Sequence, residues 1–455
     1  MFSADGASVD PDAPLPSSPT EVSGLRARLL RGVLWNVVGT VFNQGSTFVV
    51  NVILANLWGL GTFGEYAIVQ STVAAAASMA QFATGYTATK YIAEFRLADP
   101  ARTGRVIALC ALVAGVIAVI AGVTLVISGQ WLAGQMLNQP TLAQVIMSSA
   151  GVVAFSVLSG FLTGALAGFE QYAALARAGI VAGLLYTVLC SLGGGVGGLI
   201  GAILGQSISA GVLSLWLFCE LRAEVRRLSI GVRIRDGFQE TAVLFTFALP
   251  AALNNLVALP AIWLASALLV RQPQGLDEMA LFAAANNFRI IVLFLPNIVN
   301  NVGMSLLNNQ RGASAERSYR RVFWANIALT GGAVAAGAGF IAFSGRLLLG
   351  AFGPEFDDAY PALLILMAAT IPEGLALATV QTIQSHGRMW LILLGRVLPC
   401  YAVLLFVAVL FSSKLGARGL ALAYLIGWSV ALASDVLIIW RTGVWSARAA
   451  AFTAR

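Results

Sequence analysis

The sequence predicts an all-α integral membrane protein with about twelve transmembrane helices, arranged as two six-helix bundles around a central cavity. Three observations predict this class. The 455 residues are 58% hydrophobic and only 10% charged, whereas soluble domains carry about 25% charged residues. Apolar runs of bilayer-spanning length, about 20 residues each, recur along the whole chain. Lys and Arg collect in alternate connections between these runs, as expected of loops on the cytoplasmic side.

The N-terminal bundle is expected to follow a short polar tail. Residues 1–24 are rich in Pro, Ser, Asp and Gly, a composition that predicts a disordered cytoplasmic tail. The first apolar run continues to about Trp58 and is too long for a signal peptide. Within the N-terminal bundle, residues 25–220, hydropathy predicts spans near 33–57, 66–90, 106–128, 142–167, 172–194 and 198–219.

A polar cytoplasmic linker, residues 221–240, separates the two halves and carries five Arg residues. The C-terminal bundle, 241–441, precedes a cytoplasmic tail, 442–455. The second half also resembles the first weakly, because LNNLVALPAIWLASALLV echoes FNQGSTFVVNVILANLWG. Parallel repeats are common in transporters that rock two halves about a central site. The predicted C-terminal spans lie near 241–270, 280–306, 321–344, 360–384, 388–411 and 418–440.

The distribution of positive charge orients the chain. Against this map, 21 of the 27 Lys and Arg residues fall on the side of the two termini, four fall on the opposite side and two lie within spans. We therefore expect a multi-pass protein of the bacterial inner membrane with both termini in the cytoplasm. The net charge of +7 comes from Arg residues scattered between apolar runs. Membrane lipids, and not nucleic acid, are the partners that this pattern predicts.

Motifs for catalysis and for metal or cofactor binding are not found in the sequence. It has no P-loop, so ATP hydrolysis by this chain is excluded. Cys110, Cys190, Cys219 and Cys400 form no CxxC pair, and His386 is the only histidine. Neither a zinc site nor a disulfide framework is therefore indicated. We expect no enzyme activity, no cofactor and no metal.

Polar side chains inside the spans are the candidates for a substrate site. An Arg at a helix centre costs on the order of 3 kcal/mol and must find a partner or water. The eighth span carries an Asn/Arg stripe on one face at about 100° per residue. Converging amides and guanidiniums suit sugar hydroxyls and a phosphate or pyrophosphate. The predicted substrate-binding residues are Arg289, Arg396, Asn286, Asn297, Asn300, Asn254, Asn255, Asn43, Glu373 and Gln384.

Each of these residues also has a structural interpretation. Asn and Gln stripes hold bundles together through interhelical hydrogen bonds. Arg289 and Arg396 can be neutralised by a buried partner such as Glu373, or can snorkel to an interface. Asp435, deep in the last span, is a further candidate for binding a coupling ion. The pattern alone leaves both interpretations open.

The opening hundred residues carry the most specific pattern. RGVLWNVVGTVFNQGSTFVVNVILANLWGLGTFGEYAIVQSTVAAA, then TGYTATKYIAEFRLADPARTGRV, resembles the start of bacterial polysaccharide and O-antigen flippases. These belong to the multidrug/oligosaccharidyl-lipid/polysaccharide exporter superfamily. Gly59, Gly64 and Tyr66 match that family's turn after the first span, whereas Asn56 stands where the family commonly has Arg. This departure shifts the expected phosphate contact toward the two deep arginines.

The resemblance implies alternating access by two six-helix bundles, with a polyprenyl-pyrophosphate-linked oligosaccharide as substrate. The chain is then expected to flip this lipid-linked oligosaccharide across the inner membrane for surface polysaccharide synthesis, lipopolysaccharide or exopolysaccharide. A polysaccharide polymerase and glycosyltransferases of the same pathway are its expected protein partners. The alternative is an ion-coupled multidrug or small-molecule antiporter of the same superfamily. A membrane polysaccharide polymerase or ligase is less favoured, because no long external loop carries catalytic residues.

Overall fold

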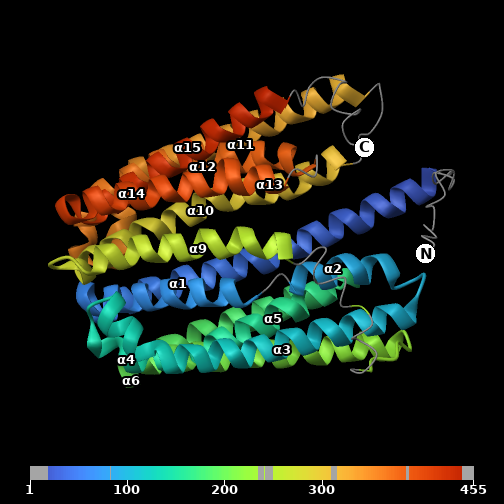
Figure 1. Ribbon diagram of the computed structural model, residues 1–455, viewed down its shortest axis with the longest axis horizontal. Coiled ribbons are helices and arrows are strands. Elements are labelled where there is room, and N and C mark those ends of the chain that lie inside the picture. Colours follow the sequence, from blue (N-terminus) through green and yellow to red (C-terminus); the bar gives the residue numbers. More distant parts are fainter. Residues whose placement is uncertain are drawn as a thin grey trace, which may run out of the picture.

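The protein is described by a computed structural model that covers residues 19–81, 84–233, 240, 249–308, 315–385 and 389–442. These residues form helices and short turns without β-strands, so the predicted all-α class is confirmed. Figure 1 shows two helical bundles lying side by side, one from the first half of the chain and one from the second. The first helix begins and the last helix ends at the same end of the molecule. We call this the termini end, and the opposite end the far end.

The N-terminal bundle is built from six spans, and two of its long helices reverse direction at a glycine. Helix α1 (Pro19–Ala80) is interrupted at Gly59, φ 68°, and α6 (Tyr172–Arg227) at Gly198, φ 57°. A residue with a Cβ avoids these left-handed angles, so glycine permits both turns. The other elements are α2 (Thr84–Phe95), α3 (Pro100–Trp131), η1 (Leu132–Met136), η2 (Pro140–Leu142), α4 (Ala143–Ser148) and α5 (Ala150–Gly168).

The C-terminal bundle contributes the other six spans. Eight helical segments are by themselves long and apolar enough to cross a membrane, and both reversing helices are among them. Counting each reversing helix twice and adding α9 and α10 gives the predicted twelve. The elements are α9 (Leu249–Val270), α10 (Gly275–Asn308), α11 (Ala315–Leu349), η5 (Gly350–Phe352), η6 (Pro354–Ala359), α12 (Tyr360–Ser385), α13 (Met389–Ile392), η7 (Leu393–Val397), α14 (Leu398–Leu415) and α15 (Ala417–Thr442).

Some boundaries differ from the predicted ones. The second span, expected to be continuous over 66–90, breaks between α1 and α2. Residues 19–24 of the predicted tail lie in α1, and residues 1–18 lie outside the described part. Helix α6 continues to Arg227, well into the predicted linker. Hydropathy detects only the apolar part of a helix. It therefore does not predict how far a helix continues into the polar interface.

Near the far end, the two bundles meet through a cluster of aromatic rings. Phe48 and Phe63 of α1 lie edge-on to Phe352 of η5, with ring centroids 5.7 and 6.3 Å apart. Phe288 of α10 completes the contact at 5.5 Å from Phe48. On a straight helix, residues 48 and 63 would stand about 22 Å apart. Their shared contact with Phe352 therefore places the two halves of α1 side by side.

Backbone and amide contacts reinforce this closure. Asn51 of α1 donates a hydrogen bond of 2.8 Å to Asn287 of α10, across the two bundles. A Cβ at Gly64 would overlap the carbonyl oxygen of Leu276, so only glycine allows α1 to approach α10 this closely. Toward the termini end the bundles diverge, with the first part of α1 running between them (Figure 1). The far end is thus the closed end of this conformation.

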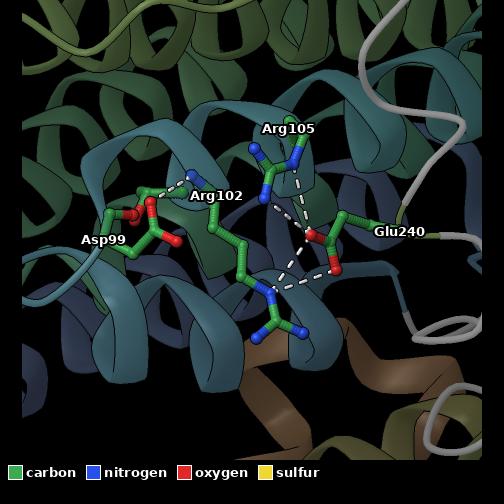
Figure 2. A network of polar contacts seen from close by, with 5 residues as sticks. Asp99, Arg102, Arg105 and Glu240 are labelled. Atoms are coloured by element: carbon green, nitrogen blue, oxygen red, sulfur yellow. Dashed lines mark hydrogen bonds and ion pairs between the residues drawn. The ribbon is translucent and has the colours of Figure 1, made fainter.

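The connection between the bundles is fastened to the termini end of α3 (Figure 2). Glu240 accepts hydrogen bonds from Nε of Arg102 at 3.1 and 3.2 Å. Nη2 of Arg105 lies 3.2 Å from the same carboxylate. Asp99 caps α3 by accepting a hydrogen bond of 2.9 Å from the backbone N–H of Arg102. One carboxylate of the connection therefore bridges two arginines at the start of α3, and the three groups keep a net charge of +1.

Candidate functional site

Four charged side chains lie inside the C-terminal bundle as two ion pairs. Arg289 of α10 meets Glu373 of α12 at 2.5 Å, with side chains 12% and 8% exposed. Arg396 of η7 meets Asp435 of α15 at 3.1 Å, with side chains 12% and 0% exposed. Removing a charge from water costs several kcal/mol unless a partner compensates it. Each deep arginine is therefore matched to one carboxylate.

Arg289 is held by three groups of different chemistry. Both contacts to Glu373 come from Nη1, and Nε donates a hydrogen bond of 2.7 Å to Asn286 one turn earlier. The guanidinium carbon lies 4.9 Å from the ring centroid of Tyr424 on α15, a cation–π contact. Within the described residues, no hydrogen bond uses Nη2 of Arg289. The guanidinium is therefore held in one orientation, and its Nη2 donates no hydrogen bond to the described residues.

Arg396 lies on a single π-helical turn, η7. Pro399 has no N–H to donate to the carbonyl four residues earlier, so the α-helical ladder cannot run unbroken through this stretch. Such π turns occur frequently at functional sites. The Nε–Asp435 contact is an ion pair that is not aligned as a hydrogen bond. Nη2 donates a long hydrogen bond of 3.4 Å to the carbonyl of Ala376.

Helix α12 connects the two pairs into one network. Glu373, Ala376 and Thr379 are three residues apart and therefore lie along one side of the helix. Thr379 donates a hydrogen bond of 3.0 Å to Asp435, and Ala376 accepts one from Arg396. The network joins α10, α12, η7 and α15. Its four charges sum to zero, so an anionic ligand would engage uncommitted donors or compete with a carboxylate.

The structure unites Arg289 with Asn286 and Glu373 and links Arg396 to them through α12. In the described part of the chain, the contacts of this network do not include Asn43, Asn297 or Gln384. Asn43 of α1 and Asn297 of α10 are exposed, and the Asn297 amide donates to its own helix. Gln384 is half-buried near the end of α12. The side chains of three further predicted residues lie outside the described part: Asn254, Asn255 and Asn300.

Sequence reasoning missed two contacts. It named Glu373 as a partner for the deep arginines but did not pair Arg396 with Asp435. It also passed over Asn287, because at 100° per residue this side chain points away from the Asn286–Arg289 stripe. The Asn286–Asn287 dipeptide could have indicated this contact, because two adjacent amides point to different faces of one helix.

Asn56 has a contact that the sequence could not indicate. It stands where arginine is expected, and its amide donates a hydrogen bond of 2.6 Å to the carbonyl of Ala351 in η5. The partner belongs to the other bundle. Asn56 therefore joins the closure at the far end.

Comparison with known proteins identifies the family. The profile of a family described as "Polysaccharide biosynthesis protein" matches residues 29–306, more than half of the chain. The chain belongs to this family. The prediction made from the opening motif is thereby confirmed.

Relatives with curated names include the EPS I polysaccharide export inner membrane protein EpsE of Ralstonia nicotianae. It is 27% identical over 158 residues, which are 34% of this chain and 36% of that protein. The Ralstonia solanacearum protein of the same name is 25% identical over 157 residues, with the same coverage. The matched stretch therefore spans about a third of either relative. The two relatives carry inner-membrane names, and this chain has the helices to span a membrane.

Solved structures with the same fold are transporters. The inward-facing conformation of a multidrug resistance MATE family transporter of the MOP superfamily gives a TM-score of 0.71 at 15% identity, covering 90% of this chain and 98% of that one. The outward-facing conformation gives 0.69 at 16%, covering 92% and 96%. A MOP superfamily transporter from Pyrococcus furiosus gives 0.68 at 16%, covering 92% and 96%. The predicted two-bundle transporter fold is confirmed.

Proposed function

We propose that this protein flips a lipid-linked oligosaccharide of the polyprenyl-pyrophosphate type across the inner membrane for surface polysaccharide synthesis, by alternating access and without enzymatic chemistry. The family match over residues 29–306 carries the proposal. The Ralstonia relatives named for polysaccharide export support it. A polymerase and glycosyltransferases of the same pathway are the protein partners that we propose.

The arrangement of the bundles supports alternating access. They are closed at the far end by the contacts of Phe352 and Asn51 and diverge toward the termini end (Figure 1). The bias of Lys and Arg assigns the termini end to the cytoplasm, where a lipid-linked precursor would be collected. Rocking the bundles would break the far-end contacts and form new ones at the termini end. The sugar headgroup would pass between the bundles while its polyprenyl tail stays in lipid.

The Arg289–Glu373 ion pair supports the proposal of a substrate with an anionic headgroup. Among the described residues, Nη2 of Arg289 retains donors that suit a phosphate oxygen, since guanidinium groups bind phosphate through charge-assisted hydrogen bonds. The neighbouring carboxylate of Glu373 limits how tightly that phosphate is held, so the substrate can leave again. Exposed amides such as Asn43 and Asn297 offer donors and acceptors to sugar hydroxyls.

Deletion of the gene and complementation with variants test the proposal. Without the protein, lipid-linked oligosaccharide should accumulate on the cytoplasmic leaflet and surface polysaccharide should fall. Wild type should restore export, and so should the control Arg346→Gln, whose guanidinium faces Tyr360 at the far end of α11. Arg289→Gln, present at equal abundance in the membrane, should not. Unchanged surface polysaccharide in the deletion strain would refute the function.

An ion-coupled multidrug antiporter is the second candidate, and one observation favours it: the buried carboxylates of Glu373 and Asp435. Proton or cation coupling in such a protein would need at least one of them. Deletion would then raise drug sensitivity without changing lipid-linked oligosaccharide. Glu373→Gln and Asp435→Asn that leave drug resistance intact would exclude this candidate.

A further inference from the structure

A cavity of about 740 Å³ opens at the termini end of the N-terminal bundle, away from the two ion pairs. One wall is formed by residues 98–101, which lead into α3 and include its first two residues. The other is formed by residues that leave α6 toward the second bundle, among them Ser229. Two guanidinium groups line it, those of Arg105 and Arg233. None of these residues has a part in the transport mechanism above.

The cavity favours an anion. The carboxylate of Asp99 is engaged as the cap of α3 by the backbone N–H of Arg102. Arg105 directs Nε and Nη2 at Glu240, which leaves Nη1 without a contact among the described residues. For Arg233, too, the described part of the chain shows no ion pair. The positive end of the α3 dipole adds to the attraction.

The cavity lies where a candidate membrane span begins, because α3 is long and apolar enough to cross a membrane. Buried apolar residues of α3 follow directly after Arg105, beginning with Val106. Leu97, next to the cavity wall, is 86% exposed. A large apolar side chain in this position is suited to the boundary between headgroups and acyl chains. A ligand with a phosphate at one end and a hydrocarbon chain at the other matches both features.

We propose that this cavity binds the phosphodiester headgroup of an anionic phospholipid from the adjacent leaflet. Arg105, Arg233 and the hydroxyl of Ser229 contact the phosphate, and the acyl chains leave past Leu97. Basic pockets between helices at the cytoplasmic face are a common form of anionic headgroup site. The bound lipid would thus contact both the start of α3 and the residues that follow α6.

Lipid binding to the purified full-length protein in detergent tests the proposal without measuring transport. Native mass spectrometry should show phosphatidylglycerol binding at least fivefold more tightly than phosphatidylethanolamine of the same acyl chains. Arg233→Gln should weaken phosphatidylglycerol binding about fivefold, the loss of one basic contact at the membrane surface. The control is Arg226→Gln, which removes the same charge at the exposed end of α6, outside the cavity, and should change binding less than twofold.

Three results would overturn the proposal. Equal binding of the two lipids by wild type would remove the anionic selectivity. Equal losses of phosphatidylglycerol binding for the Arg233→Gln and Arg226→Gln variants would indicate diffuse electrostatic attraction and not a defined site. If micromolar glycerol phosphate displaced the lipid, the cavity would be a site for a soluble anion and not for a lipid. Because no outcome depends on flipping, failure here leaves the proposed function untouched.

Discussion

Removing one member of the Arg289–Glu373 pair should destabilise the protein more than removing both. Arg289→Gln abolishes the 2.5 Å ion pair and the contact with the Tyr424 ring. It also leaves the Glu373 carboxylate, which is only 8% exposed, without its ion-pair partner. An uncompensated buried charge costs about 3–5 kcal/mol. The same reasoning gives a similar loss for Glu373→Gln, which strands the guanidinium.

The double variant Arg289→Gln/Glu373→Gln leaves two neutral amides of similar volume that can bond to each other. We expect it to be less destabilised than either single variant, so the interaction energy should exceed the cost of one single substitution, about 3–5 kcal/mol. Titration with SDS in mixed micelles measures the free energy of unfolding of the four proteins in the cycle. The single variant Arg346→Gln, exposed at the far end, is the control and should change stability by less than about 0.5 kcal/mol.

The same four proteins separate a structural role from a substrate role. If Arg289 contacts the phosphate, the double variant should be stable and still unable to support polysaccharide export. Additive losses in stability would refute the coupling inferred from the structure. A stable double variant with normal export would show that Arg289 only holds the bundle together.

The other predictions concern the second ion pair and the far-end closure. Thr379→Val removes a hydrogen bond to the buried Asp435 carboxylate and should cost about 1.5–3 kcal/mol in the SDS titration, whereas Thr47→Val, which lacks such a partner, should be near neutral. Gly64→Val should prevent α1 from approaching Leu276, so spin labels across the far end should show a longer distance by electron–electron double resonance; an unchanged distance would contradict the close approach. Phe352→Ala empties a fully buried position in the aromatic cluster and should cost about 3–5 kcal/mol; a cysteine introduced next to Phe48 should then become reactive to membrane-impermeant maleimide from outside.

Sequence reasoning fixed the class of fold well because the bilayer imposes its own rule. Backbone groups in hydrocarbon must be satisfied within helices, so a count of apolar runs predicted twelve spans correctly. It also placed the turns near residues 59 and 198, where Gly59 and Gly198 now show left-handed angles. Local breaks such as the α1–α2 interruption depend on packing between helices and left no signal in hydropathy.

The candidate site was predicted in part for a related reason. A charged residue inside a span is rare, so Arg289, Glu373 and Asp435 stood out from the sequence. Their pairing is a matter of tertiary contact, and Arg396 met Asp435 from a distant helix. The roles of the amides could not be predicted from the sequence. An Asn that closes the far end, such as Asn51, follows the same sequence pattern as an Asn that lines a pathway.

The most direct test of the central claim uses the purified protein in proteoliposomes that contain a polyprenyl-pyrophosphate-linked oligosaccharide. The fraction of substrate reached by an added glycosidase reports its transfer between leaflets over time. We predict rapid protein-dependent transfer by wild type and by Arg346→Gln, and none above empty liposomes for the stable Arg289→Gln/Glu373→Gln variant. Folded wild-type protein that leaves the substrate in its original leaflet would contradict the account.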